Sequence, residues 1–166
     1  MNRIKRILRH LLTTTAAGRR AFPPATLEAI QHAIAAGEAL HRAEVRLIVE
    51  PALELGELWR GESARQRARD LFAEYGIWDT EENCGVLIYI NLADHQVEIV
   101  ADRGVGRAIA AHEWEAVCKT MTRDFAHGRF HDSALAALEQ LNALLHQRFP
   151  ASGPRPDQLS NQPLIL

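Results

Sequence analysis

The sequence has few cysteines, few aromatic residues and no long apolar run. Its 166 residues include two cysteines and no Cys-x-x-Cys pair. This argues against a disulfide framework and favours reduced, buried thiols, which are typical of the cytosol. No apolar run approaches the length that spans a bilayer, and the N-terminus lacks the continuous apolar core of a secretory signal. We therefore expect a cytoplasmic protein.

Carboxylates are missing from residues 1–20, which carry six basic side chains. Removing those six from the total of 19 leaves 13 basic against 21 acidic groups, so the rest of the chain has a net charge of −8. A basic segment on an acidic body predicts contact with an anionic partner. Nucleic acid is not favoured, because no aromatic residues lie among the basic ones and the body is acidic.

The same N-terminal segment has the pattern of an amphipathic helix. Its apolar residues recur at helical spacing and basic residues fill the opposite face: Ile4, Ile7, Leu8, Leu11 and Leu12. The apolar stripe either packs on the domain, which we favour, or lies in a membrane interface with its cations towards anionic lipid. Residues 1–20 are thus predicted to be a helix and linker, with peripheral contact to the inner membrane as the alternative.

Residues 21–149 have the pattern of one α/β domain, and the length of the chain fits a single domain. Strands are expected at 43–50, 85–90 and 97–101, and helices at 23–37 and 64–75, around Trp114 to Phe125, and at 132–149. The strand–helix–strand unit predicts a parallel pair, and the short turn after residue 90 predicts an antiparallel third strand. The expected fold is a three-layer α/β/α sandwich with a small mixed sheet. Residues 150–166 contain four prolines and are predicted to be disordered.

Polar side chains flank the predicted hairpin where its first strand begins and its second strand ends. Antiparallel pairing brings both groups to one rim of the sheet. Calcium and magnesium prefer carboxylate and amide oxygens from several segments, so the candidate metal ligands are Asp79, Glu81, Glu82, Asn83 and Asp102. Gly104 and Gly106 leave backbone N–H groups free for a phosphate, and Arg103 and Arg107 add charge-assisted bonds. The alternative is that these are solvated loop residues, and the sequence leaves both readings open.

Other residues that can bear chemistry are better explained by structure. His127 and His131 have the spacing of a zinc pair, but Gly128 interrupts the helix and a third ligand is missing, so we expect surface histidines. Cys84 and Cys118 lie on apolar faces and are expected in the core. The tryptophans at 59, 78 and 114 are expected to be packing anchors. No Ser-His-Asp or Cys-His arrangement stands out.

Several segments together resemble the TPM-domain family over residues 42–148. They are Val45–Val49, Arg67–Phe72, Gly85–Ile88, Val97–Gly104 and Phe125–Phe130. The family includes photosystem-repair proteins of the thylakoid lumen and many bacterial envelope proteins. The resemblance implies an α/β/α sandwich, and some relatives are described as acid phosphatases or as binding calcium near the sheet rim. The family usually has Asp-Asn-Gly where this chain has Asn83-Cys84-Gly85, so a neighbouring acid would have to replace that carboxylate.

Three functional hypotheses follow. The first is a binding or accessory module that acts with a membrane or envelope partner protein. The second is a phosphatase dependent on calcium or magnesium, with Asp102 and Glu82 as ligands and Arg103 holding the phosphate. The third is a structural calcium site without catalysis.

Overall fold

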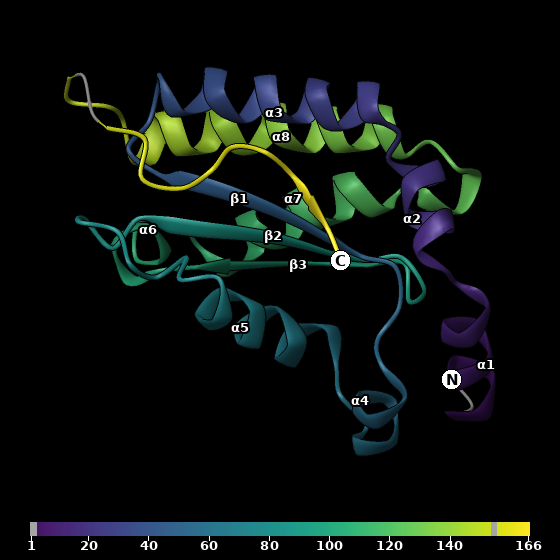
Figure 1. Cartoon of the computed structure of the whole chain (residues 1–166). Helices are drawn as coiled ribbons and strands as arrows, with labels where there is room; N and C mark the ends of the chain where they lie inside the picture. Colours follow the sequence, from purple (N-terminus) through teal and green to yellow (C-terminus); the bar gives the residue numbers. More distant parts are fainter. Residues whose placement is uncertain (1–2, 154–155) are drawn as a thin grey trace.

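A mixed four-stranded sheet lies between two layers of helices in the computed structural model (Figure 1). The structure describes residues 3–153 and 156–166. The strands are β1 (Glu44–Glu50), β2 (Gly85–Asn91), β3 (Gln96–Ala101) and β4 (Leu164–Ile165), and their order across the sheet is β3-β2-β1-β4. The helices are α1 (Arg3–Leu12), α2 (Thr15–Ala21), α3 (Pro24–Glu38), α4 (Leu55–Arg60), α5 (Ala64–Glu74), α6 (Arg103–Gly106), α7 (Ala111–Thr122) and α8 (Phe130–Arg148), with a 3-10 turn η1 (Phe125–His127).

The central strands pair as the sequence predicts. β1 runs parallel to β2, with Glu44 opposite Gly85, and β2 runs antiparallel to β3, with Val86 opposite Ala101. Every residue of β2 is buried, because helices cover both faces of this continuously apolar strand. The α/β fold with parallel and antiparallel pairs is confirmed.

The two faces of the sheet have separate cores. Helices α3, α7 and α8 cover one face and α5 covers the other (Figure 1). The α3–α8 contact is close, since a Cβ on Gly37 would lie 2.2 Å from the side-chain oxygen of Asn142. The Asn142 amide also donates to the carbonyl of Ala33 at 2.9 Å. Glycine at position 37 therefore sets the distance between these helices.

The C-terminal segment differs from the expectation of disorder. Leu164 and Ile165 form β4, which pairs in parallel with Ile48 and Val49 of β1. Leu159, Leu164 and Leu166 pack against the core on the α5 side. These leucines are partly buried, so each contributes less than the roughly 1.5–3 kcal/mol of a fully buried leucine, and together they offset part of the cost of ordering the segment.

None of the helices in the described part of the chain is long and apolar enough to cross a membrane.

Candidate functional site

The two segments of the predicted rim meet at the end of the hairpin. The N–H of Gly104 donates to the carbonyl of Asn83 at 2.9 Å, and the N–H of Asp102 donates to the carbonyl of Gly85 at 2.9 Å. A Cβ on Gly104 would lie 2.5 Å from the carbonyl oxygen of Glu82. The backbone contact at this rim therefore requires a glycine. We call residues 79–83 together with 102–107 the rim site.

The rim carboxylates have separate partners. Asp102 is 9% exposed and accepts a hydrogen bond from the N–H of Arg103 at 2.6 Å, so it caps the short helix α6. Glu82 forms an ion pair with Arg42 at 2.8 Å, while Asp79 and Glu81 are exposed. In the described residues, these acids do not form a group of three whose oxygens lie within 4.8 Å of one another. The rim brings the segments together without gathering the predicted metal ligands.

The rim site does form a basic pocket. A cavity of about 450 Å³ is lined by Asn83, Arg103, Gly104 and Arg107. The Arg103 side chain is 79% exposed, and Asn83 adopts a left-handed backbone with φ 53°, which Asn and Asp tolerate better than other non-glycine residues. The pocket thus combines two guanidinium groups with an amide, which suits an anion. Of the other predicted residues, Gly106 lies in α6 but does not line this pocket.

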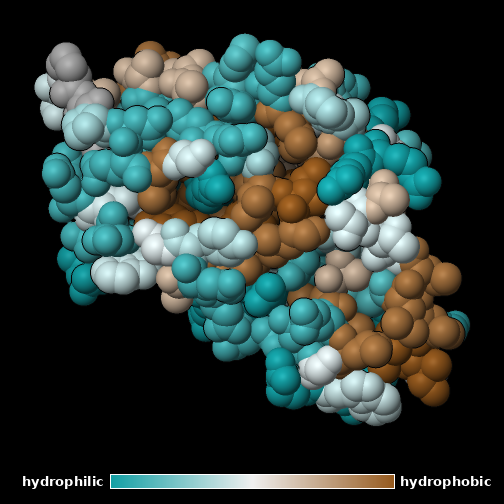
Figure 2. All heavy atoms as spheres, in the orientation of Figure 1, coloured by the Kyte–Doolittle hydropathy of each residue, from teal (hydrophilic) through white to brown (hydrophobic). Residues whose placement is uncertain are grey.

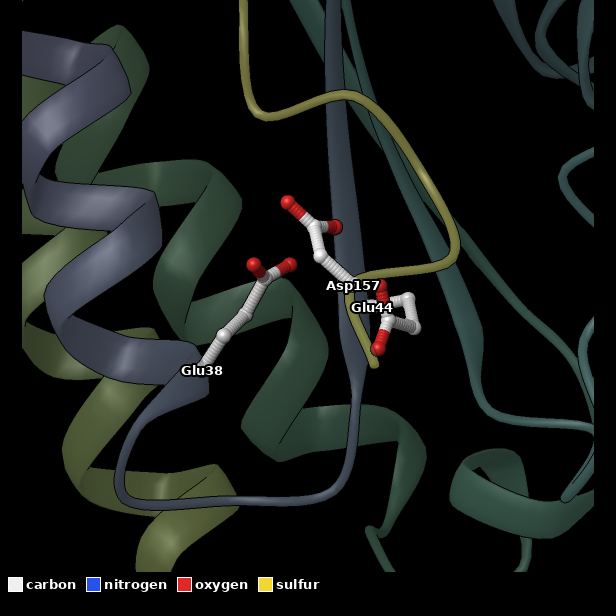
Figure 3. Close-up of side chains that lie close together, drawn as sticks. All are labelled: Glu38, Glu44 and Asp157. Carbon is white, nitrogen blue, oxygen red and sulfur yellow. The ribbon is translucent and has the colours of Figure 1, made fainter. Parts of the chain in front are cut away.

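An acidic cluster that the sequence did not predict lies beside the start of β1. It consists of Glu38 at the end of α3, Glu44 at the start of β1, and Asp157 in the C-terminal segment. One carboxylate oxygen from each lies within 4.8 Å of the others, the one such group of three among the described residues. Figure 3 shows the Glu38 and Asp157 carboxylates facing each other. These residues help to line a cavity of about 600 Å³.

Glu38 is the most perturbed carboxyl group of this acidic cluster. Burial raises its pKa to about 8, and the negative charges of Glu44 and Asp157 add to the rise, while a hydrogen bond from the N–H of Val45 opposes it. That N–H lies 2.7 Å from the Glu38 carboxylate. Glu44 is held differently, because its carboxylate accepts hydrogen bonds from the N–H groups of Gln158 and Leu159 at 3.1 and 3.2 Å. The backbone of the C-terminal segment therefore satisfies one acid, while Glu38 tends to stay protonated.

A buried polar network occupies the opposite end of the sheet. Arg67 of α5 binds both oxygens of Glu50 at 2.8–3.2 Å, and the hydroxyl of Tyr89 donates to the same carboxylate. Asn91 donates to the Tyr89 hydroxyl at 3.1 Å and accepts from the N–H of Asp94 at 2.9 Å. Burial, and then the Glu50 charge, raises the pKa of Tyr89 above its usual range. The network connects α5 with the turn between β2 and β3.

That turn anchors α1 through its polar face. Arg6 and Arg9 pair with the Asp94 carboxylate, Arg6 at 2.8 Å. His10 is buried, with its Nδ1 accepting from the N–H of Leu53 at 3.0 Å and its Nε2 lying 3.2 Å from Asp94. Burial of Asp94 opposes its ionisation, but hydrogen bonds from His10 and Arg6 outweigh burial and hold the Asp94 pKa well below its usual range. The charged face of α1 is therefore the face that docks.

The apolar face of α1 consequently points to solvent, so the favoured prediction of packing against the domain was wrong. Its exposed residues are Ile4 (66%), Leu8 (54%), Leu11 (55%) and Leu12 (81%), and the neighbouring α4 adds Leu55 (48%) and Trp59 (64%). We call these six residues the apolar surface. Arg3 joins the two helices, since its guanidinium lies over the Trp59 ring and bonds the Trp59 carbonyl. Figure 2 shows a brown area at the lower right, in the place that α1 and α4 occupy in Figure 1.

The remaining predicted residues have structural environments. His127 lies in η1 and His131 in α8, where its Nδ1 contacts the Thr26 hydroxyl at 3.0 Å, so the two do not share one helix face. Cys84 is buried, and burial raises the pKa of Cys118 to about 11, which disfavours a thiolate nucleophile.

The tryptophans divide into two groups. Trp114 packs against the core, as predicted, whereas Trp59 and Trp78 are 64% and 54% exposed, so their prediction as packing anchors was wrong. Trp59 lies in the short helix α4, and Trp78 lies in the loop between α5 and β2.

Comparison with known proteins identifies the family. A sequence model of the TPM domain matches residues 18–144, most of the chain. The chain belongs to the TPM-domain family. The fold of this TPM domain is similar to the NMR structure of BA42 protein from the psychrophilic bacterium Bizionia argentinensis, with a TM-score of 0.74, 24% identity, and coverage of 85% of this chain and 92% of that one. A search of curated proteins found no match.

The sequence missed two features of this TPM domain for different reasons. The members of the acidic cluster are more than a hundred positions apart at their extremes, and no local pattern joins Glu38 to Asp157. The orientation of α1 depends on Asp94, a turn residue whose role as a partner of the arginines is not marked by any spacing. The one hint of this contact in the sequence was the positive charge of residues 1–20, which predicted a negatively charged partner for that segment.

Proposed function

We propose that this TPM domain is a binding module that acts with a membrane or envelope partner protein, at the cytoplasmic face of the inner membrane. The observation that carries the proposal is the apolar surface, which remains exposed while the polar face of α1 is bound to the body. Exposed apolar patches bordered by polar residues mark interaction sites in soluble domains. The surface is preformed, so a partner would not have to order it on binding.

The chemistry of the described side chains also favours binding over catalysis. Asp102 is used as a helix cap and Glu82 in an ion pair, so neither is free to hold a metal without giving up a partner. Burial raises the pKa of the Cys118 thiol to about 11, which disfavours the thiolate form that a cysteine nucleophile needs.

A pull-down from the native host tests this function. Full-length tagged protein is cross-linked in cells, and the recovered proteins are compared with those of the Leu8→Asp/Leu12→Asp variant. Leu40→Asp is the matched control, because Leu40 is 51% exposed and follows the end of α3. We expect a membrane protein to be recovered with wild type and Leu40→Asp and lost with the double variant. Identical sets of proteins from all three would refute the proposal.

A second candidate function is a phosphatase dependent on calcium or magnesium. The basic pocket of the rim site favours it, since Arg103 and Arg107 line the pocket and guanidinium groups can bind a phosphate group. Purified protein is assayed against p-nitrophenyl phosphate with calcium, with magnesium and with a chelator. Cation-dependent turnover that falls on Arg103→Ala and on Asp102→Ala supports this candidate. No turnover under any of these conditions removes it and leaves the binding module unaffected.

A further inference from the structure

The apolar surface lies on the outside of the molecule. α1 stands at the edge of the fold in Figure 1, next to α4 and away from the sheet. Ten residues at 1.5 Å each give a helix of about 15 Å, half the thickness of a hydrocarbon core of about 30 Å. Such a helix can lie along a membrane surface but cannot cross it.

The charges of α1 and α2 are of one sign, whereas the exposed Glu54 lies beside Leu55 at the start of α4. Residues 1–20 contain no carboxylate. Arg6 and Arg9 are paired with Asp94, but within the described part of the chain Lys5, Arg19 and Arg20 are exposed and form no ion pair with a carboxylate. On a helical wheel, Lys5 falls beside Leu12 at the border of the apolar face. Lys5 therefore borders the apolar residues of α1, and Arg19 and Arg20 add positive charge on the helix that follows. An apolar face bordered by cations is the pattern of a helix that lies in an anionic interface.

Trp59 adds a second feature of such interfaces. Its ring is 64% exposed at one side of the apolar surface, with the Arg3 guanidinium 5.4 Å from the ring centre. Tryptophan favours the boundary between headgroups and acyl chains, because one end of its ring system is apolar and the other donates a hydrogen bond. The tryptophan and its stacked arginine thus extend the lipid-facing side from α1 to α4.

We propose that the apolar surface binds an anionic lipid bilayer, with α1 in the plane of the interface. This inference rests on the proposed function, because lipid contact through the apolar surface would hold the domain at the membrane beside its partner protein. A second copy of the chain fits less well, because a symmetric dimer through this surface would bring together the unpaired cations of both copies. The arrangement also fixes an orientation: α1 is docked at the turn between β2 and β3, whereas the rim site lies at the other end of that hairpin and faces away from the bilayer.

Vesicle co-sedimentation of the full chain tests the inference. We expect binding to vesicles of phosphatidylglycerol mixed with phosphatidylcholine, weaker binding to phosphatidylcholine alone, and a loss of binding at high salt. Leu8→Asp/Leu12→Asp should weaken binding by more than about tenfold, since aspartate is costly at an apolar interface. Arg19→Gln/Arg20→Gln should weaken it by up to about twenty-five-fold on the anionic vesicles alone, because each of two cations near an anionic surface contributes a factor of about five.

The controls separate lipid contact from misfolding. Leu40→Asp and Arg69→Gln change exposed residues away from the apolar surface and should bind like wild type. The Leu8 and Leu12 side chains are exposed, so circular dichroism and the melting temperature of that variant should match wild type. A blue shift of tryptophan fluorescence on adding vesicles should survive in Trp78→Phe and disappear in Trp59→Phe.

Three results would overturn the inference. One is wild-type protein that stays in solution with anionic vesicles. Another is equal binding by wild type and Leu8→Asp/Leu12→Asp. The third is a dimer in analytical ultracentrifugation that the Leu8→Asp/Leu12→Asp change dissociates, which would assign the surface to a second copy. If vesicle binding fails while the pull-down still recovers a partner through this surface, lipid is excluded and the proposed binding module stands.

Discussion

The Arg6 guanidinium and the Asp94 carboxylate lie 2.8 Å apart, although 88 positions separate them in the chain. Their contact turns an amphipathic helix so that its charged side faces the protein. The Asp94 side chain is 4% exposed, and a buried carboxylate of this kind requires partners. The position of α1 is therefore set by electrostatics and hydrogen bonding, not by its apolar stripe.

Asp94→Asn should release α1. The substitution removes the charge that Arg6, Arg9 and His10 share, and charge-assisted hydrogen bonds contribute about 1.5–3 kcal/mol each. We expect trypsin to cut after Arg6 and Arg9 at least about tenfold faster, since cleavage follows the population of the open form. Asp132→Asn, which changes an exposed carboxylate of α8, should digest like wild type. Equal rates for all three proteins would show that the contact does not hold the helix.

The docking of α1 should also depend on pH. Because the folded-state pKa of Asp94 is depressed, its contribution is fully present above the unfolded value of about 3.9. It is lost as the pH falls from there towards the folded value. Hydrogen exchange of α1 amides should therefore accelerate, relative to the core strands, as the pH is lowered below about 4. A helix that stays protected to the same degree in acid would contradict this.

Tyr89→Phe should destabilise the core on the α5 side. It removes the hydroxyl that donates to Glu50 and accepts from Asn91, leaving buried polar groups with fewer partners at a cost of about 1–3 kcal/mol. Urea unfolding measures the loss. Tyr75→Phe is the control, because that ring is 38% exposed and should change the free energy of unfolding by less than about 0.5 kcal/mol.

Ionisation of Tyr89 should also lower the stability of the wild type at alkaline pH. The pKa of Tyr89 is raised in the folded state, so its contribution is fully present below the unfolded value of about 10 and is lost as the pH rises above it. The wild type should lose stability above about pH 10, and Tyr89→Phe should lose less over the same range. Parallel pH profiles for the two proteins would show that Tyr89 ionises normally.

Gly104→Ala should be far more damaging than Gly106→Ala. A Cβ at position 104 meets the backbone oxygens of Glu82 and Asn83 at 2.5 and 2.6 Å, whereas at position 106 the nearest atom is 3.5 Å away. Overpacking against backbone costs about 1–3 kcal/mol, so we expect a clear fall in melting temperature for the first variant and little change for the second. Equal melting temperatures would mean that the rim segments separate easily.

Glu38→Gln should flatten the pH dependence of stability near neutrality. The pKa of Glu38 is raised to about 8, so its contribution is fully present below the unfolded value of about 4.3 and is lost as the pH rises to the folded value. Wild type should lose stability between these limits, and the glutamine variant should lose less. Glu139→Gln, an exposed change in α8, should follow wild type. A wild-type profile as flat as that of Glu38→Gln would contradict a raised pKa.

The fold could be predicted because its signals are local, but the sites could be predicted only in part. Periodicity located β1, β2 and β3, and the hairpin alone brought Asp102 and Asn83 to one rim. The hairpin pattern did not reveal that the Asp102 side chain would cap α6. The pairing of Leu164 with Ile48 joins residues 116 positions apart. The apolar stripe of α1 predicted an amphipathic helix, but it did not predict that the apolar face would point to solvent. Long-range pairing and charge contacts leave no periodic trace.

The pairing of β4 with β1 has a consequence during synthesis. The outer edge of β1 has no neighbour until residues 164–165 have been made and have folded back onto Ile48 and Val49. Until then a nascent chain offers an open strand of alternating N–H and C=O groups, a template on which other chains can assemble. Once β4 has paired with Ile48 and Val49, that part of the edge of β1 can no longer pair with another chain.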